Sequence, residues 1–279
     1  MSHVSCFLGN QSRVDADALI NLKLDTLSNG LQVNDETNPL IGLQGRLDLL
    51  KRLGSVLKSP KNQDFFFDSN DSSYRPGNLI NFLLLNSKNS QVDIKVLWKV
   101  VIDGFGGVWP EEGRIKMEGV CLGDVWPSEI LNNNSNNADS NSFVTFHKLS
   151  QWLTYSLIEP IEQFMNLKFQ NKTLLTGLAE YRNGGLFIDL GVLKVKNNFI
   201  KTEYKPSDEV IIQWRALTIC LLDRLAPLLR ARLGVDEETF CLPKMLEGGT
   251  WKAGRIIAKE KRPGTAGPPI KIVSDGTLF

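Results

Sequence analysis

The chain has 279 residues, of which 42% are hydrophobic and 23% charged, and its formal net charge at pH 7 is +1. This length and composition are typical of a soluble globular protein that buries a sizeable core. A net charge near zero gives no electrostatic reason to expect nucleic acid or an anionic membrane as a partner. The N-terminus has no basic segment followed by an apolar run, and no window is apolar enough to span a bilayer, so we expect a cytoplasmic protein.

Cysteine and histidine are too few and too scattered for a metal centre or a disulfide framework. The four cysteines lie far apart without a C-x-x-C pair, and the two histidines are His3 and His147. We therefore expect reduced thiols, no metal and no cofactor. A single histidine such as His147 is more typical of a hydrogen-bonded structural residue than of a ligand or base.

Helical periodicity predominates in the first part of the chain. Residues 1–38 are mixed and polar, with one short apolar patch around Leu19. From Pro39 onward, leucines recur at steps of three and four residues as far as Leu57. The expected elements up to residue 102 are this amphipathic helix, a polar loop as far as Pro76-Gly77, and helices over 79–84 and 92–102.

The second part of the chain carries weaker strand signals between longer helices. Residues 114–120 alternate at period two and predict a small strand or ribbon. The other expected elements are a flexible Asn-rich surface loop over 132–141, a helix over 143–161 that Pro160 bends or ends, a long helix over 210–233 that begins at Ser207-Asp208-Glu209 and ends before Gly234, and a C-terminal strand and turn. We therefore expect a single helical domain over 1–279, mainly α, with a small β ribbon and an extended C-terminal tail.

Residues 178–191 combine charged groups with an otherwise apolar segment. Glu180 and Arg182 stand among large apolar side chains, and Gly184-Gly185 follows them. A buried charge costs several kcal/mol unless it is paired or used. One interpretation is an interior ion pair at the start of a packed helix, with the glycines as its cap. The other is a ligand site at which the glycines let the chain bend.

Lys148 and Gln151 lie three residues apart on a largely apolar helix, where an unpaired lysine has little room. Pairing of Lys148 with a carboxylate such as Glu180 is one interpretation, and extension of its side chain to the surface is the other.

Two glycine-containing segments are candidates for anion binding. Gly248, Gly249 and Thr250 form an expected turn before a helix start, where free N–H groups, with Lys252 nearby, can bind a phosphate. A plain N-cap at Thr250 is the alternative. Residues 274–277 are similar to a phosphoribosyl-binding loop, but their place at the end of the chain, without α/β alternation, favours a strand and turn.

Five motifs together resemble one known family. They are residues 146–152, 178–191, 214–217, 246–254 and 272–279. On these motifs the chain, from about Leu31 to Phe279, resembles the uracil-catabolism protein family of fungi and bacteria, a domain of unknown function. The resemblance implies a role in uracil and pyrimidine degradation. Because family members carry a further N-terminal part, it also implies that this chain lacks that part.

A second, more distant resemblance concerns mechanism. Thr176–Arg182 followed by Leu190–Leu193 is similar to the core signature of queuosine-salvage nucleotide N-glycosidases, with Glu180 where that family has Asp. Lys148–Gln151 and Pro39–Arg46 are similar to two further motifs of the same family. This resemblance implies a helical fold related to helix-hairpin-helix DNA glycosylases.

Together the resemblances imply a hydrolase, an N-glycosidase that cleaves a small ribosyl substrate, ribosylurea or its 5′-phosphate, to urea and ribose or ribose phosphate. Glu180 would stabilise the positive charge that develops on the ribose and orient the attacking water. Lys148 would keep Glu180 ionised or hold a phosphate. The implied substrate-binding residues are Tyr181, Arg182, Phe146, Gln151, Trp152 and Asp275.

Two other function classes stay open. One is a phosphoribosyltransferase-like enzyme, which would depend on pyrophosphate and Mg²⁺ and which the helical patterning disfavours. The other is a non-catalytic partner of other uracil-catabolism enzymes. In each case the expected ligands are small molecules or proteins of the same pathway, and neither nucleic acid nor membrane.

Overall fold

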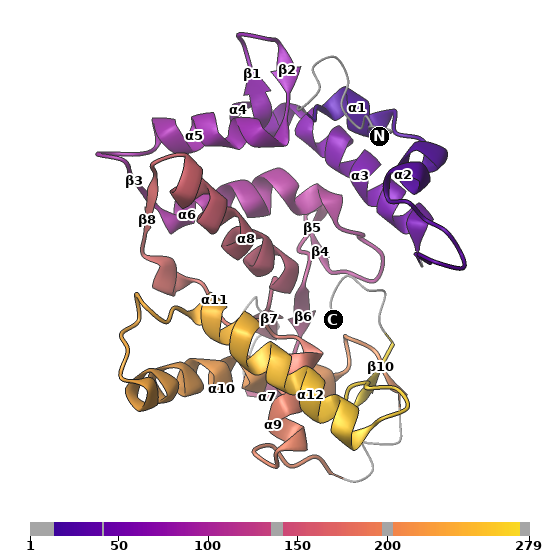
Figure 1. Ribbon diagram of the computed structural model, residues 1–279, viewed down its shortest axis with the longest axis vertical. Helices are drawn as coiled ribbons and strands as arrows, with labels where there is room; N and C mark the ends of the chain where they lie inside the picture. Colours follow the sequence, from indigo (N-terminus) through magenta and orange to yellow (C-terminus); the bar gives the residue numbers. More distant parts are fainter. Residues whose placement is uncertain (1–13, 41, 135–141, 197–202, 274–279) are drawn as a thin grey trace. The chain divides into compact units, whose positions relative to one another are not determined.

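The computed structural model describes residues 14–40, 42–134, 142–196 and 203–273 (Figure 1). Its contacts divide the chain into two compact units, which we describe separately. Unit 1 is Met1–Pro110 with Leu157–Lys172, and unit 2 is Glu111–Ser156 with Thr173–Phe279. Helices make up most of each unit, and the described strands pair two by two. The mainly α fold class is confirmed, and the single domain over 1–279 stays a prediction.

Unit 1 consists of short helices with two small strand pairs. Its helices are α1 (Ala16–Ile20), α2 (Leu24–Gly30), α3 (Leu43–Leu57), α4 (Gln63–Phe66), α5 (Leu79–Leu85) and α6 (Ile94–Lys99), with the helical turns η1 (Pro60–Asn62), η2 (Pro76–Asn78), η3 (Val100–Gly104) and η4 (Gly106–Val108). Its strands are the antiparallel pair β1 (Phe67–Asp68) and β2 (Ser73–Tyr74) and the parallel pair β3 (Gln91–Asp93) and β8 (Lys168–Gln170).

The leucine-rich helix that the sequence predicts corresponds to α3. It ends at Leu57 as expected but begins at Leu43 rather than at Pro39, since Gly42 precedes it with a left-handed φ of 77°. Leu47 of α3 packs against Leu22 and Leu27. Helices α1 and α2 lie in the N-terminal region around these two leucines, for which the sequence predicts no element beyond a short apolar patch. The expected loop before Pro76 is also wrong in part, because it contains α4 and the β1–β2 pair.

The helix expected over 92–102 begins two residues late. Val92 pairs with Phe169 in the β3–β8 ladder, so it belongs to a strand. Asp93 then caps α6, since its carboxylate accepts a hydrogen bond of 2.8 Å from the Lys95 N–H.

Unit 2 carries the longer helices. Its elements are β4 (Lys116–Met117), β5 (Val120–Cys121), β6 (Val125–Pro127), α7 (Glu129–Asn134), β7 (Phe143–Thr145), α8 (Lys148–Phe164) as far as Ser156, α9 (Tyr181–Asp189), β9 (Glu203–Tyr204), α10 (Glu209–Leu233), α11 (Leu242–Lys244), the π-helical turn η8 (Met245–Trp251), α12 (Lys252–Lys261) and β10 (Lys271–Ile272), with a 3₁₀ turn η6 (Lys172–Leu174) at the junction of the units. Strands β4–β5 and β6–β7 pair antiparallel, and β9–β10 pair parallel. The predicted ribbon near 114–120 and the long helix that ends at Gly234 are confirmed.

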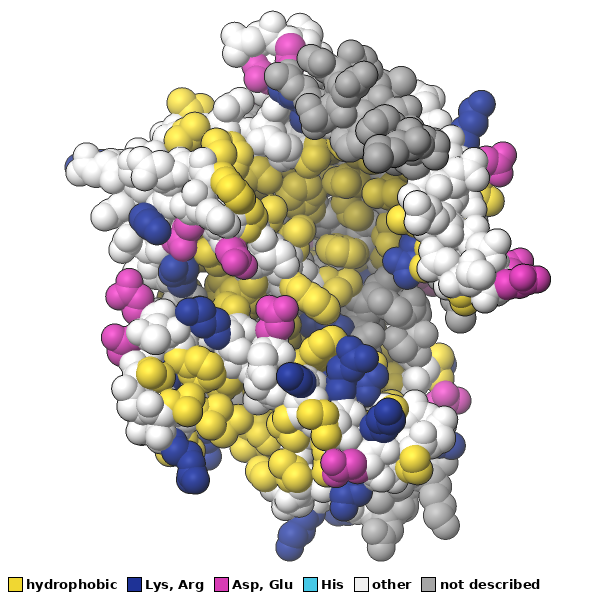
Figure 2. Space-filling view, viewed as in Figure 1, with side chains coloured by type: hydrophobic (Ala, Val, Ile, Leu, Met, Phe, Trp, Pro, Cys, Tyr) yellow, Lys and Arg dark blue, Asp and Glu magenta, His cyan; other side chains and the backbone are white. Residues whose placement is uncertain are grey.

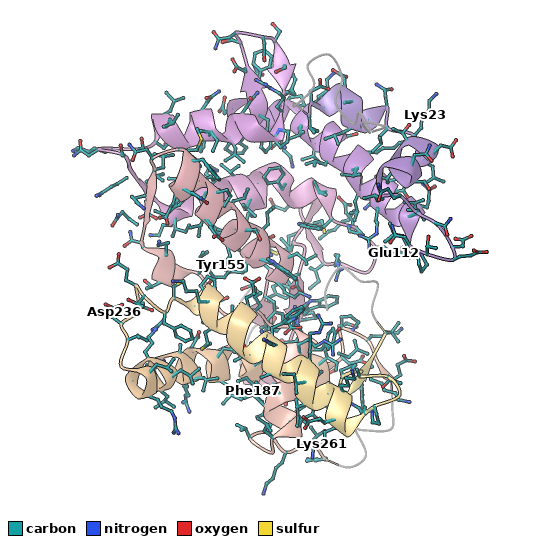
Figure 3. The ribbon with its side chains drawn as sticks, viewed as in Figure 1. Lys23, Glu112, Tyr155, Phe187, Asp236 and Lys261 are labelled. Atoms are coloured by element: carbon teal, nitrogen blue, oxygen red, sulfur yellow. The ribbon has the colours of Figure 1, made fainter. Side chains whose placement is uncertain are left out.

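Helix α9 packs against both α10 and α12 (Figure 1). The approach is close because glycines face the neighbouring helices: a Cβ on Gly184 would lie 2.6 Å from the Thr218 hydroxyl, and a Cβ on Gly254 would overlap the Arg182 carbonyl. Gly184-Gly185 is therefore the interior of a helix and not the bend or cap that the sequence suggested. Helices α9 and α12 can be followed in Figure 3, where Phe187 marks α9 and Lys261 marks the end of α12.

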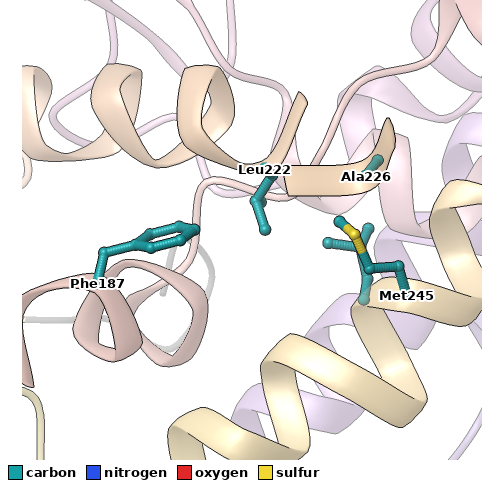
Figure 4. Close-up of a cluster of buried hydrophobic side chains, with 5 residues drawn as sticks. Phe187, Leu222, Ala226 and Met245 are labelled. Atoms are coloured by element: carbon teal, nitrogen blue, oxygen red, sulfur yellow. The ribbon is translucent and has the colours of Figure 1, made fainter. Parts of the chain in front are cut away.

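A hydrophobic cluster fills the space between α9, α10 and η8. Phe187, Leu222, Ala226 and Met245, shown in Figure 4, form it together with Leu246. On the outside, hydrophobic and basic side chains lie next to one another over α12, where Arg255, Ile256 and Lys259 are exposed (Figure 2). In the described ranges we find no helix with the length and hydropathy that a bilayer crossing requires.

Three expectations for unit 2 and α8 need correction. Residues 143–145 form strand β7, paired with β6, and the helix starts only at Lys148. Pro160 lies inside α8 and does not end it, because the helix continues to Phe164. The first three residues of the expected Asn-rich loop belong to α7, and residues 135–141 lie outside the described residues.

Candidate functional site

Four charged side chains interact in the interior of unit 2, and we call them the charge cluster: Asp124, Lys148, Glu180 and Arg215. They come from the loop before β6, the first residue of α8, the residue before α9 and the middle of α10. Lys148 and Glu180 are each 5% exposed, and Arg215 is 1% exposed. Charges buried to this degree are paired, neutralised or functional.

Glu180 is the N-cap of α9. Its backbone is extended, and its carboxylate accepts hydrogen bonds from the N–H groups of Arg182 at 2.9 Å and Asn183 at 2.6 Å. These bonds fix the orientation of the carboxylate and place it at the positive end of the helix dipole. Burial nevertheless dominates and raises the pKa of Glu180, against the opposing effects of the two N–H donors and of the Lys148 charge.

Lys148 interacts with Glu180 through charge and has no direct partner in the described part of the chain. There, neither a hydrogen bond nor an ion pair to its ammonium group is found, although its charge interacts with those of Glu180, Asp124 and Arg215. Burial lowers the pKa of Lys148 to about 8, and the positive charge of Arg215 acts in the same direction. Such a lysine can lose or accept a proton near neutral pH.

Asp124 and Arg215 form a buried, bidentate ion pair, with both Nη–Oδ distances at 2.7 Å. Burial is the largest single influence on the pKa of Asp124 and raises it. The hydrogen bonds and charge of Arg215 outweigh burial, together with hydrogen bonds from the Trp126 indole and the Lys148 N–H. The pKa of this carboxyl therefore lies below its ordinary value. The guanidinium also lies 4.0 Å from the centre of the Phe146 ring.

The sequence did not predict a role for either member of this pair. A signal for Arg215 was present, because it lies on the buried face of α10 at helical spacing from Ile211, Thr218 and Leu222. No comparable signal exists for Asp124, which lies in a short loop and meets Arg215 across 91 residues of chain.

The other residues predicted on α8 and before it differ in their positions. Phe146 is buried in one hydrophobic cluster with Trp126 and Ala179, next to Glu180 in the chain. Gln151 is buried and accepts a hydrogen bond of 3.3 Å from the Thr176 N–H. Trp152 is 49% exposed. The structure therefore places Phe146 at the charge cluster, and the hydrogen bond of Gln151 connects α8 to the segment before Glu180.

Tyr181 and Arg182 line a narrow crevice between α9, α12 and the segment 267–269, which has no room for a water molecule. Arg182 donates a hydrogen bond of 2.8 Å to the Ala266 carbonyl and lies over the Tyr181 ring. Lys148 and Glu180 are not among the lining residues of this crevice. Nowhere in the described residues are three or more His, Cys, Asp and Glu side chains grouped so that they could hold a metal ion.

The predicted phosphate-binding segment is helical throughout. Gly248 and Gly249 lie inside the π-helical turn η8, which continues α11 and runs on into α12, so the expected turn before a helix start is wrong. Thr250 is buried and donates to the Asn183 side chain, while Lys252 is exposed. Phosphate binding by these residues stays a prediction, and Asp275 lies outside the described residues.

Comparison with known proteins identifies relatives over nearly the whole chain. Residues 3–279 match the family described as "Protein of unknown function (DUF1688)". Uracil catabolism protein 4 of Lachancea kluyveri is 40% identical over 292 residues, which cover 96% of this chain and 63% of that protein. Protein urg3 of Schizosaccharomyces pombe is 41% identical over 272 residues, which cover 96% of this chain and 61% of that protein. The chain thus spans less than two thirds of the length of these curated relatives.

Proposed function

The chain belongs to the DUF1688 family, and on that premise we propose that it acts in uracil catabolism as an N-glycosidase. A relative named for uracil catabolism supports the pathway. The proposed substrate is ribosylurea or its 5′-phosphate. Water replaces urea at C1′ of the ribose: the C1′–N bond breaks, a C1′–O bond forms, and the proton from water goes to the departing nitrogen.

The observation that carries this proposal is the buried carboxylate of Glu180, whose charge interacts with that of the buried Lys148. Cleavage of an N-glycosidic bond builds positive charge on the ribose ring, and a fixed carboxylate in a poorly solvated place stabilises that charge strongly. The N–H bonds of Arg182 and Asn183 hold Glu180 in one orientation. Each carboxylate oxygen keeps a further lone pair with which to orient the attacking water.

Lys148 supports this role of Glu180 through charge. Burial alone favours the neutral carboxylic acid, and the Lys148 ammonium opposes this, which favours the ionised form that the reaction needs. With its pKa near 8, Lys148 is also suited to relay this proton, giving one to the departing nitrogen and regaining one from the attacking water. Tyr181, Arg182 and Trp152 are not required by this mechanism, and their predicted contacts with substrate remain proposals.

The test is release of urea from ribosylurea and from its 5′-phosphate. We expect Glu180→Gln, which keeps an oxygen to cap α9 but loses the charge, to release urea at least about 100-fold more slowly than the wild type. Asp93→Asn in unit 1 is the matched control, because Asp93 also caps a helix through its carboxylate and lies outside the site. Its rate should equal that of the wild type.

Two results would contradict the proposal: no urea from either substrate with the wild-type protein, or wild-type release by folded Glu180→Gln. The second result would leave Glu180 as a helix cap only. The first result would favour a non-catalytic partner of other pathway enzymes, and neither substrate would then raise the melting temperature of Glu180→Gln. Dependence of turnover on pyrophosphate and Mg²⁺ would instead indicate a phosphoribosyltransferase-like reaction.

A further inference from the structure

We propose that the buried Asp124–Arg215 pair is a positioning device, which fixes the two backbone segments that carry Lys148 and Glu180 to helix α10. The inference rests on the proposed function of Glu180 and Lys148 and names the residues that would hold them in place. Asp124 and Arg215 act through their neighbours and have no assigned contact with the substrate.

Asp124 holds the segment that leads into Lys148. Its carboxylate accepts a hydrogen bond of 3.1 Å from the Lys148 N–H, and its carbonyl accepts bonds from the N–H groups of Phe146 at 3.0 Å and His147 at 3.3 Å. Three consecutive N–H groups therefore point to one aspartate. The Trp126 indole, which donates to the same carboxylate at 2.8 Å, fixes the aspartate in turn.

The backbone at His147 is constrained where Asp124 holds it. His147 has a φ of 46°, in the left-handed region that residues other than glycine avoid. Strained backbone of this kind persists where surrounding contacts impose it, and it is found preferentially at functional sites. Here the strained residue immediately precedes Lys148, so the contacts with Asp124 decide where α8 begins and where its lysine is placed.

Arg215 holds the segment that leads into Glu180. Its Nε donates a hydrogen bond of 3.2 Å to the carbonyl of Ala179, the residue before Glu180. Its two terminal nitrogens bind Asp124, and its flat face covers the Phe146 ring. One guanidinium thus joins the Lys148 segment to the Glu180 segment, an arrangement that the fork-shaped donor set of arginine allows and that lysine cannot reproduce.

The pair also balances charge around Lys148. Arg215 disfavours the ammonium form of Lys148, while Asp124 and Glu180 favour it. Loss of one member therefore leaves a charge of known sign beside Lys148. The titration midpoint of Lys148 should therefore shift in a predictable direction, which a contact without an effect on Lys148 would not cause.

The first test follows the titration of Lys148 by NMR in protein labelled with ¹³C-lysine, with Lys148→Met to identify its resonance. We expect Asp124→Asn, which leaves the Arg215 charge, to lower the midpoint by about half a pH unit or more, and Arg215→Gln, which leaves the Asp124 charge, to raise it. The matched control is Asp189→Asn, since Asp189 forms another bidentate pair in unit 2, partly buried, with Arg262 at 2.8 and 2.6 Å. It should leave the midpoint unchanged.

The second test replaces the pair as a whole by apolar residues, Asp124→Leu with Arg215→Met. Such exchanges often preserve folding, because no buried charge is left alone. For a positioning role we expect the folded variant to release urea at least about 10-fold more slowly at saturating substrate, with KM changed by less than about threefold, and its Lys148 resonance to move or broaden.

The proposal is overturned if Lys148 titrates alike in the folded single variants and in Asp189→Asn. It is also overturned if the folded paired variant keeps both the wild-type Lys148 resonance and the wild-type rate. A wild-type protein that releases no urea would remove the proposed function alone, because the NMR measurements still decide whether Asp124 and Arg215 fix the Lys148 segment.

Discussion

Thr250 and Asn183, 67 residues apart in the chain, are joined by a hydrogen bond of 2.8 Å from the threonine hydroxyl to the asparagine side-chain oxygen. Asn183 also donates its backbone N–H to Glu180 and its amide group to the Leu178 carbonyl. The π-helical turn η8 therefore supports the first turn of α9, where the candidate carboxylate lies. Thr250 has this role whether or not the neighbouring residues bind phosphate.

Thr250→Val should lower the free energy of unfolding by about 1–3 kcal/mol. Valine has nearly the same shape as threonine but leaves the buried Asn183 oxygen without the Thr250 donor. Denaturant unfolding measures the effect, and Thr173→Val, at an exposed position, serves as the control and should change stability by less than about 0.5 kcal/mol. Equal stability of Thr250→Val and wild type would mean that the hydrogen bond contributes nothing.

Gly184→Ala and Gly248→Ala should change stability in opposite directions. At Gly184 a Cβ would lie 2.6 Å from the Thr218 hydroxyl and 2.7 Å from the Trp214 indole nitrogen, so we expect a loss of about 1–3 kcal/mol. At Gly248 a Cβ meets nothing within 4 Å, and alanine favours helix over glycine by up to about 1 kcal/mol. Melting temperatures of the two variants provide the comparison, and a stable Gly184→Ala would contradict the close contact between α9 and α10.

Lys148 should make the stability of the protein depend on alkaline pH. Burial lowers its pKa from 10.5 to about 8, so between these values the unfolded chain binds a proton that the folded protein has released. Stability contributed at this position is therefore lowest below pH 8 and rises as the pH increases towards 10.5. Relative to Lys148→Met, the wild type should gain about 2–3 kcal/mol between pH 7 and pH 10.

The control for this measurement is Lys148→Arg. Arginine stays charged over the whole interval, so this variant should not gain stability relative to Lys148→Met as the pH rises. A wild-type curve parallel to that of Lys148→Met would show that Lys148 titrates alike in the folded and unfolded chain.

Arg182→Met should affect stability more than turnover. The guanidinium holds the Ala266 carbonyl and covers the Tyr181 ring, contacts that attach the segment after α12 to α9. We expect a loss of about 1 kcal/mol in the free energy of unfolding and a fall in urea release much smaller than that of Glu180→Gln. A loss of turnover as large as that of Glu180→Gln would instead place Arg182 on the substrate, as its resemblance to the glycosidase signature implies.

Several elements of the fold are predictable because local sequence patterns determine them. The leucine spacing before Leu57 and the position of Gly234 after α10 each predict a helix boundary from short-range chemistry. Strand β7 is less accessible to such reasoning: Phe143–Thr145 precedes an apolar helix, and only its pairing with β6 makes it a strand. The same holds for Val92, which belongs to a strand and not to the expected helix because it pairs with Phe169, more than 70 residues away in the chain.

The candidate site is predictable only in part, for a related reason. Glu180 and Lys148 stand out because charge in an apolar segment is visible in the sequence itself. Asp124 does not, since its partner, its depth and its three N–H donors all come from distant segments. The glycines of α9 are ambiguous for the same reason. The sequence does not distinguish a glycine that permits a bend from one that allows a neighbouring helix to approach closely, and Gly184 has the second role.

The π-helical turn η8 holds one residue more than an α-helical segment of the same hydrogen-bonded span. Loss of one residue between Met245 and Trp251 can therefore be absorbed by a return to α-helical hydrogen bonding, which keeps the face of α12 that meets α9 through Gly254 in place. Loss of a second residue would rotate α12 by about 100° and bring a bulky side chain towards the Arg182 carbonyl. In this turn the chain thus tolerates shortening by one residue but not by two.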